Sequence, residues 1–324
     1  MSTRFGPSVS EASSIGCTAR SRLEMSGGDG VVHGVFDGAI NILLANGLIS
    51  LVPEAGERGP LNIVLRLPAG AQGMSSLGVR SRDRVVRNNS GLEVGPRHRV
   101  SFGSARTYSP RRKFPLPNLE EREILANLEA ATNTALLRGN KAGLGELLTL
   151  ARPGEAAVEA SGLNMFASAA LPRILRLEEA FLSGEKTMIT EAVGELVGLG
   201  PGLTPSSDDM LAGLVLLCVL YAKNFGRAQR AIPVVARAVA EQPRGRTTIL
   251  SEEFLRQAAS GRGNERVMRL CTSMLTEGRE SVERETERVL AIGETSGTDT
   301  VLGVTLGTML CAGRRFGSDE RESE

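Results

Sequence analysis

The chain has 324 residues, of which 41% are apolar and 23% charged, and its formal net charge is +1. This length accommodates two domains with hydrophobic cores of their own, and the balanced charge favours neither nucleic acid nor a membrane as a partner. Aromatic residues make up 3% of the chain and tryptophan is absent, so the stacking surfaces that bind single-stranded nucleic acids are scarce.

The cysteines and the N-terminus bear on metal binding and location. The four cysteines, Cys17, Cys218, Cys271 and Cys311, are far apart and form no zinc-binding pattern. The last three lie in apolar helical segments and are interpreted as reduced core residues. The N-terminus lacks the pattern of a signal peptide, and the longest apolar run is too short to span a bilayer. We therefore expect a cytoplasmic protein without a membrane segment.

The N-terminal third is predicted to be β-rich. Residues 1–24 are rich in serine and unpatterned, which indicates a flexible tail. Residues 25–113 contain short β-branched and apolar runs separated by turn sequences. Among these turns, Asn46-Gly47 between two apolar runs is typical of a hairpin. We predict a small barrel or sandwich with strands at 31–36, 39–44, 48–52, 61–67, 79–86, 92–94 and 99–104.

Arginines accumulate toward the end of this domain, where Asp83 and Glu93 are the acidic residues of the segment. Arginine alternates with apolar residues, which is typical of the solvent-facing side of strands. The alternative interpretation is a surface for a small anion or an acidic partner subunit. The basic residues are Arg80, Arg82, Arg84, Arg87, Arg97, Arg99, Arg106, Arg111, Arg112 and Lys113.

Helical periodicity begins after this segment. Residues 114–313 are predicted to form a larger all-helical domain, and residues 314–324 a charged tail. The chain is therefore expected to have an α+β fold. Pro172 is expected to kink or split its helix. The expected helices cover 118–137, 141–150, 164–182, 186–196, 206–222, 228–241, 247–259, 265–276, 279–292 and 298–311.

One glycine-rich stretch, Gly198 to Asp209, combines a tight turn with the start of an apolar helix. Thr204 is a candidate N-cap with Pro205 in the first helical position, and Ser206 with Asp209 offers an alternative cap. Capping alone does not need this many glycines or two carboxylates. Glycines let a ligand approach the backbone, and free N–H groups at a helix start attract anions. The candidate ligand-binding residues are Gly200, Gly202, Thr204, Ser206, Ser207, Asp208 and Asp209.

A second helix start repeats this pattern 90 residues later. Ser296, Asp299 and Gly303 align with Ser206, Asp209 and Gly213. We expect the two turns to form one cavity, with Ser296 and Gly297 binding substrate and Asp208, Asp209 and Asp299 as catalytic residues. The three carboxylates would also suit weak Mg²⁺ or Mn²⁺ binding, because a cation relieves their repulsion. Alternatively, these are two capped helices that never meet.

A third polar patch lies at Arg246, Thr247 and Ser251. Its simplest role is helix capping. Its alternative role is substrate binding, because an arginine suits an anionic group and the hydroxyls lie about one helical turn apart.

These motifs, in this order, resemble the AllH-like family, formerly catalogued as a domain of unknown function. The resemblance rests on Gly-Leu-Gly-Pro-Gly-Leu-Thr-Pro-Ser-x-Asp-Asp, on Thr-x-x-x-Ser, and on Ile-Gly-x-x-Ser-Gly-x-Asp-x-x-x-Gly, over residues 30–312. It implies a subunit of oxamate carbamoyltransferase, an enzyme of allantoin catabolism that works with two partner subunits. That enzyme converts oxalurate and phosphate to oxamate and carbamoyl phosphate. The chain departs from the family pattern at Ser207, commonly glycine, and at Glu294-Thr295, where a histidine is common.

The residues permit this chemistry and leave two alternatives open. Backbone N–H groups near Gly200–Thr204 would stabilise a developing oxyanion, and the aspartates would accept hydrogen bonds from substrate NH₂ groups. The first alternative is a magnesium-dependent hydrolase that resembles ADP-ribosylglycohydrolases. The second is a regulatory or scaffold subunit that binds a small anion without catalysis.

Overall fold

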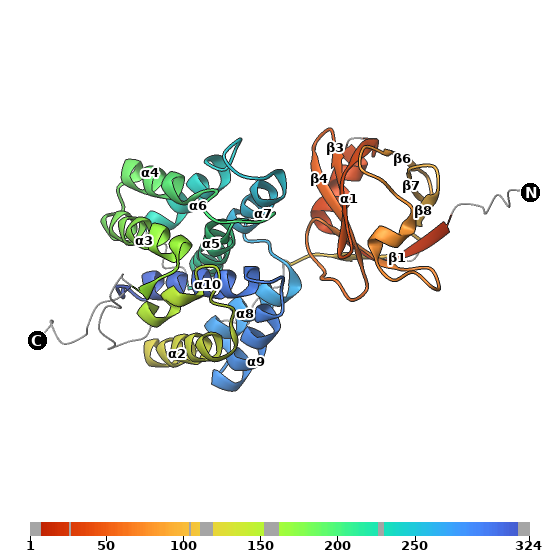
Figure 1. Ribbon diagram of the computed structural model, residues 1–324. Coiled ribbons are helices and arrows are strands. Elements are labelled where there is room, and N and C mark those ends of the chain that lie inside the picture. The colour runs from red at the N-terminus through yellow and green to blue at the C-terminus, as the bar shows by residue number, and fades with distance from the viewer. Residues whose placement is uncertain are drawn as a thin grey trace, which may run out of the picture. The chain divides into compact units, whose positions relative to one another are not determined.

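The computed structural model describes residues 8–25, 27–103, 105–110, 119–151, 162–225 and 230–316 (Figure 1). Contacts within the chain divide it into two units, residues 1–112 and 113–324. The first unit is built from strands and the second from helices, so the predicted α+β fold is confirmed.

The first unit is a closed β-barrel. The strands form a mixed sheet in the order β5-β4-β3-β2-β6-β7-β8-β1. Strand β1 pairs with β8 on one side and with β5 on the other, and this second pairing closes the sheet into a barrel. Strand β9 pairs in parallel with the C-terminal end of β1, at Ser14 to Gly16. Closure satisfies the backbone groups that an open sheet would leave at its edges. The strands are β1 Ser8–Gly16, β2 Gly30–Phe36, β3 Ala39–Leu44, β4 Gly47–Pro53, β5 Asn62–Arg66, β6 Arg84–Asn88, β7 Gly91–Val94, β8 His98–Ser101 and β9 Arg106–Tyr108.

The expectation of a flexible tail at residues 1–24 is wrong for the part that the structure describes. Residues 8–16 form β1, and Cys17–Met25 form helix α1. Ala12, Ile15, Ala19 and Leu23 are buried in the barrel core. Two of the serines that suggested a loose segment, Ser10 and Ser14, are buried as well, and the strand is stabilised by pairing with β5 and β8, far away in sequence.

The barrel interior is filled by aliphatic side chains, including Ile42, Leu51, Ile63 and Val100. A short 3-10 helix, η1 at Met74–Leu77, buries Met74 and Leu77 in the same core. Part of the strand expected at 79–86 is a turn, and β6 starts at Arg84.

The second unit is a helical domain in which nearly every expected helix forms. Asn164 caps α3 by accepting hydrogen bonds from the N–H groups of Phe166 and Ala167, and α3 continues through Pro172 without being split. The segment expected as a helix at 141–150 is instead a turn followed by a 3-10 helix. The helices are α2 Glu121–Arg138, η2 Gly145–Ala151, α3 Met165–Ser183, α4 Lys186–Leu196, α5 Ser206–Phe225, α6 Ala231–Glu241, α7 Ile249–Ala259, α8 Glu265–Thr276, α9 Arg279–Leu290 and α10 Ser296–Cys311.

Helices α5 and α10 form the centre of this domain, and they lie parallel with their backbones in close contact. A β-carbon on Gly213 would lie 2.3 Å from the carbonyl oxygen of Thr300, and one on Gly303 would lie 1.9 Å from that of Met210. Thr300 and Met210 are again 90 residues apart, so the two contacts are related by the internal repeat. Glycine is needed at both positions because only the absence of a side chain permits this approach.

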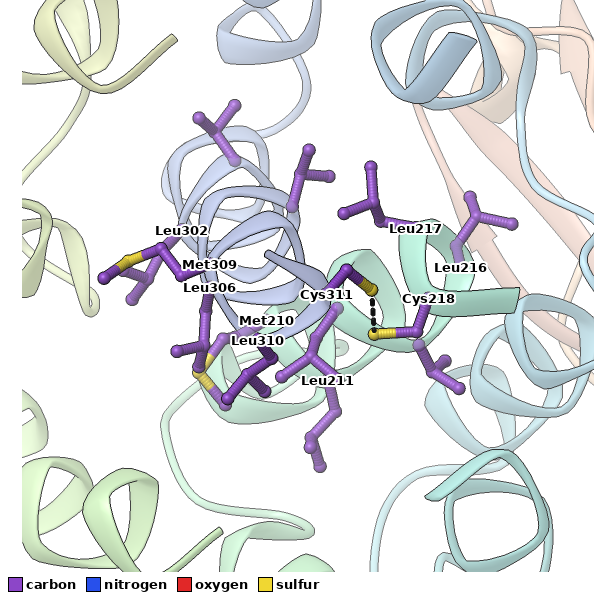
Figure 2. Packing of buried hydrophobic residues seen from close by; sticks show 14 of the residues in the cluster. Met210, Leu211, Leu216, Leu217, Cys218, Leu302, Leu306, Met309, Leu310 and Cys311 are labelled. Carbon is purple, nitrogen blue, oxygen red and sulfur yellow. Dashed lines mark hydrogen bonds between the residues drawn. The ribbon is translucent and has the colours of Figure 1, made fainter. Parts of the chain in front are cut away.

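Figure 2 shows the apolar side chains around this helix pair, among them Leu211, Leu217, Leu306 and Leu310. Farther along the pair, Cys218 and Cys311 are buried and unbridged, with their sulfur atoms 3.7 Å apart. Because the helices run parallel, this packing also brings their N-termini to the same end of the pair.

Within the described residues, none of the helices combines the length and the apolar character needed to cross a membrane.

Candidate functional site

The turn before α5 is built on three glycines in the left-handed region of backbone conformation. Gly198, Gly200 and Gly202 have φ values of 80°, 119° and 94°. A β-carbon on Gly198 would lie 2.5 Å from the carbonyl oxygen of Arg246, and one on Gly200 would lie 2.7 Å from the amide nitrogen of Ser206. These two glycines are therefore required for the fold of the turn itself.

Asp208 ties this turn to the third sequence motif. Its Oδ1 accepts the N–H of Gly198 at 2.8 Å, and its Oδ2 accepts the hydroxyls of Thr247 and of Ser251, the latter at 2.6 Å. Asp208 and Ser251 are buried. The carboxylate is thus fully occupied by internal donors, and the structure assigns it a positioning role.

Ser207 and Arg246 are also engaged by the fold. The Ser207 hydroxyl donates to the carbonyl oxygen of Leu199 at 2.7 Å and lies 2.5 Å from that of Leu196. The Arg246 guanidinium donates to the carbonyl oxygen of Gly194 at 2.7 Å and to the side chain of Gln242 at 3.0 Å. The cap of α7 is Thr248, whose hydroxyl accepts the N–H of Ser251.

The two helix starts meet, as expected from the repeat. The hydroxyls of Thr204 and Ser296 lie 3.2 Å apart, and Thr204 donates to Asp209 Oδ2 at 3.0 Å. Thr204 therefore links the two turns instead of capping α5. Gly297 has a packing role, because a β-carbon there would lie 2.2 Å from the carbonyl oxygen of Val289.

Asp209 and Asp299 are two carboxyl groups whose pKa values are raised by burial. Burial raises the pKa of Asp209 well above its ordinary value, while the hydroxyls of Ser296 and Thr204 lower it and the nearby charges of Asp299 and Asp208 raise it further. Burial raises the pKa of Asp299 to about 6, offset in part by the N–H of Leu144, which donates to Oδ1 at 2.7 Å, and by the hydroxyls of Ser206 and Thr295. The Asp209 residue keeps some solvent exposure, whereas Asp299 has none. Perturbed carboxyl groups of this kind cluster at functional sites.

The sequence analysis missed a third element of the site, the glycine-rich segment 139–145. The backbone N–H of Asn140 donates to the Thr298 hydroxyl at 2.9 Å, and the Asn140 side chain donates to the carbonyl oxygen of Glu294. β-carbons on Gly139 and Gly145 would each lie 2.9 Å from Thr298 Cγ2. Three glycines and an asparagine within seven residues indicate a turn, which could have been recognised from the sequence.

Gly143 closes over two buried polar atoms. A β-carbon on Gly143 would lie 2.5 Å from Asp299 Oδ2 and 2.8 Å from Ser206 Oγ. Both oxygens are buried and close to each other, and neither makes a hydrogen bond of normal geometry within the described residues. A buried polar atom without a partner is costly, so these oxygens are suited to hydrogen bonds from a donor group that enters the site.

The predicted metal site does not assemble as one ligand group. Over the ranges that the structure describes, His, Cys, Asp and Glu side chains form no group of three or more that could hold a metal ion. Asp208, one of the three expected ligands, directs both of its oxygens to Gly198, Thr247 and Ser251. The remaining candidates, Asp209 and Asp299, are better suited to accepting N–H or O–H groups.

The raised pKa of Asp299 gives a pH-dependent prediction. Between its ordinary value of 3.8 and about 6, the folded state holds a proton that the unfolded state has lost, so stability falls as pH rises through this window. The loss amounts to about 3 kcal/mol at about 1.4 kcal/mol per pKa unit. Asp299→Asn should remove this part of the pH dependence. Denaturant unfolding of both proteins from pH 4 to 7 measures it, and parallel profiles would contradict the prediction.

Two models of known families match this chain. Residues 11–107, which lie within the barrel unit, match the AllH family N-terminal domain. Residues 196–308, which include both helix starts and the Thr247–Ser251 motif, match oxamate carbamoyltransferase subunit AllH. No solved structure matches the chain. The two matches cover the barrel and the candidate site, and the chain therefore belongs to the AllH family.

Proposed function

We propose that this chain is a subunit of an oxamate carbamoyltransferase complex and that it binds the anionic amide substrate where α5 and α10 begin. The substrate would be oxalurate in one direction and oxamate in the other. Asp209 is the proposed binding residue, with Ser206, Ser296 and Asp299 around it.

One observation carries this proposal: two parallel helices bring their N-termini together around hydroxyl and carboxyl groups that are not all used by the fold. Thr204 and Ser296 join the two turns, and Asp299 Oδ2 and Ser206 Oγ lie close together without a hydrogen bond of normal geometry in the described part of the chain. Helix N-termini attract the carboxylate of a small acid. Carboxylate oxygens accept hydrogen bonds from amide NH₂ groups. Oxalurate and oxamate carry both groups.

The reaction sets the demands on such a site. A phosphate oxygen attacks the carbamoyl carbon of oxalurate, the bond from that carbon to the oxamate nitrogen breaks, and this nitrogen takes up a proton. Acceptors for the substrate NH₂ groups orient the carbamoyl carbon, and N–H donors stabilise the oxyanion that develops on it. Asp209 and the backbone around Gly200–Thr204 are the proposed sources of these two contributions. The phosphate site is left to the partner subunits, because the arginine of the third motif is bound to Gly194 and Gln242.

The test separates binding from catalysis. The purified chain is titrated with oxamate and oxalurate by calorimetry, and carbamoyl phosphate formation is measured for the chain alone and after co-expression with the other subunits of the complex. We expect binding by the chain alone and turnover with the partners. Binding without turnover in either preparation would indicate a non-catalytic binding subunit. If the chain binds neither oxamate nor oxalurate, the assignment of the site is refuted.

A further inference from the structure

The barrel carries a cluster of arginines at the end where β1 begins. Two neighbouring turns hold it: Arg80 and Arg82 lie in the turn that leads into β6, and Arg97 lies in the turn between β7 and β8. A β-carbon on Gly78 would lie 3.8 Å from Arg97 Cδ, and one on Gly95 would lie 2.4 Å from Asp83 Oδ2, so the turns are in contact. All three arginines are exposed.

Like Arg106, and unlike Arg84, Arg87 and Arg99, these three arginines have no guanidinium partner among the described residues. Arg84 pairs with Asp29, Arg99 pairs with Glu93, and Arg87 donates to the carbonyl oxygen of Leu23. Asp83, the nearest acid in sequence, accepts the backbone N–H of Arg80 at 2.8 Å. Within the described ranges, the guanidinium groups of Arg80, Arg82 and Arg97 contact no acidic side chain. Arg111, Arg112 and Lys113 of the predicted patch lie outside these ranges.

The backbone of Arg82 adds a second observation. Among the described residues it is the only one other than glycine with a positive φ, at 71°. This conformation is uncommon for a long side chain, and such positions are often found at functional sites. Its N–H donates to the carbonyl oxygen of Val32, which holds the turn against β2 and keeps the side chain at the surface.

Exposed apolar residues adjoin the arginines on the outer face of the barrel. Val31 of β2 is the register partner of Arg84 and is 46% exposed. Val9 of β1 is the register partner of Arg99 and is 53% exposed. Register partners share one face of a sheet, so basic and apolar side chains lie side by side. Arginine mixed with apolar residues is typical of protein interfaces.

We propose that this docking face, defined by Arg80, Arg82 and Arg97 on the two contacting turns, docks on an acidic surface of a partner subunit. The partner subunit itself rests on the proposed function. Three guanidinium groups without a partner in the described ranges supply the charge complementarity. The arginines project from exposed turns next to apolar residues, which suits the acidic side chains of a protein better than a small anion in a closed site.

The first arm of the test is association with the partner subunits. The variant R80E/R82E/R97E is compared with R106E/R269E/R279E, which makes the same change in net charge at exposed arginines outside the docking face. Each is purified and mixed with the other subunits of the complex, and association rates are measured at low and high salt. The docking variant should associate at least about tenfold more slowly at low salt, and the control should behave like wild type. Equal rates for both variants would overturn the proposal.

The second arm does not depend on the proposed function. Binding of a fluorescent ten-residue polyglutamate peptide and of a single-stranded RNA oligonucleotide is measured by anisotropy for the same three full-length proteins. Peptide binding that is retained by the control and lost by the docking variant supports the face, even if no partner subunit associates with wild type. Equal peptide binding by both variants, or tighter RNA binding that the docking variant loses, would refute an acidic protein partner. Circular dichroism confirms that each variant is folded.

Discussion

Asp209→Asn should abolish substrate binding while leaving the fold intact. Asparagine keeps an oxygen that accepts the Thr204 hydroxyl, so the link between the two helix starts survives. It removes the negative charge and replaces one acceptor oxygen with a donor NH₂ group, which would oppose the NH₂ group of the substrate. Loss of a hydrogen bond to a charged group costs about 1.5–3 kcal/mol, or roughly ten- to a hundredfold in affinity.

The same substitution should have little effect on stability. Burial raises the pKa of Asp209, which means that the charged form is disfavoured in the folded protein, and asparagine removes this penalty. The lost interaction with the helix dipole is worth only about 0.3–1 kcal/mol. Thermal melting and calorimetric titration with oxamate on the same protein measure both effects.

Asp208→Asn is the matched comparison, because it makes the same chemical change one residue away. Asp208 accepts three internal donors, and asparagine offers only one acceptor oxygen for them. We therefore expect Asp208→Asn to lower the melting temperature more than Asp209→Asn does. If Asp209→Asn melts much earlier and still binds oxamate, Asp209 is a structural residue and the proposed site is wrong.

Gly303→Val should prevent folding of the helical domain. The β-carbon alone would lie 1.9 Å from the carbonyl oxygen of Met210 and 2.9 Å from the amide nitrogen of Leu214, and both atoms belong to the backbone of α5. Backbone cannot move aside as a flexible side chain does, so α5 and α10 must separate along the most buried surface of the domain. Overpacking a core usually costs about 1–3 kcal/mol, and separating two backbones should exceed about 4 kcal/mol, a large share of the stability of a typical domain.

Gly162→Ala serves as the control for Gly303→Val, since a β-carbon at Gly162 meets nothing within 4 Å. Urea unfolding followed by circular dichroism should show a loss of the helical transition for Gly303→Val and an unchanged midpoint for Gly162→Ala. A folded Gly303→Val protein with wild-type stability would show that the close contact between the two helices is not required.

Much of the helical domain follows from local sequence. The periodicity of residues 164–182 predicts a helix, and α3 begins at Met165 with Asn164 as its cap. The repeat at an offset of 90 residues predicts two equivalent helix starts, and Gly213 and Gly303 make equivalent contacts with the opposite helix. A glycine that recurs at the same position of an internal repeat indicates the same close packing in both copies. These features can therefore be recognised without a structure.

The roles of the two adjacent aspartates were decided by tertiary structure. Successive residues on a helix point about 100° apart, so Asp208 faces the turn and α7 while Asp209 faces the start of α10. Which direction carries an internal partner depends on the helices that pack there, and the sequence does not contain this information locally. Three carboxylates were expected to bind the ligand. Because the hydroxyls of Thr247 and Ser251 donate to Asp208, only Asp209 and Asp299 remain as candidates.

Long-range pairing decided the rest. The sequence by itself determined the β-rich and helical halves, the glycine turn and the repeated helix starts, because each depends on residues close together in the chain. Only the tertiary structure turned the serine-rich segment 8–16 into the strand that closes the barrel, since its partners β5 and β8 lie about 50 and 90 residues away. Likewise, only helix packing placed Asn140 and Gly143 over Thr298 and Asp299, because that contact joins segments more than 150 residues apart.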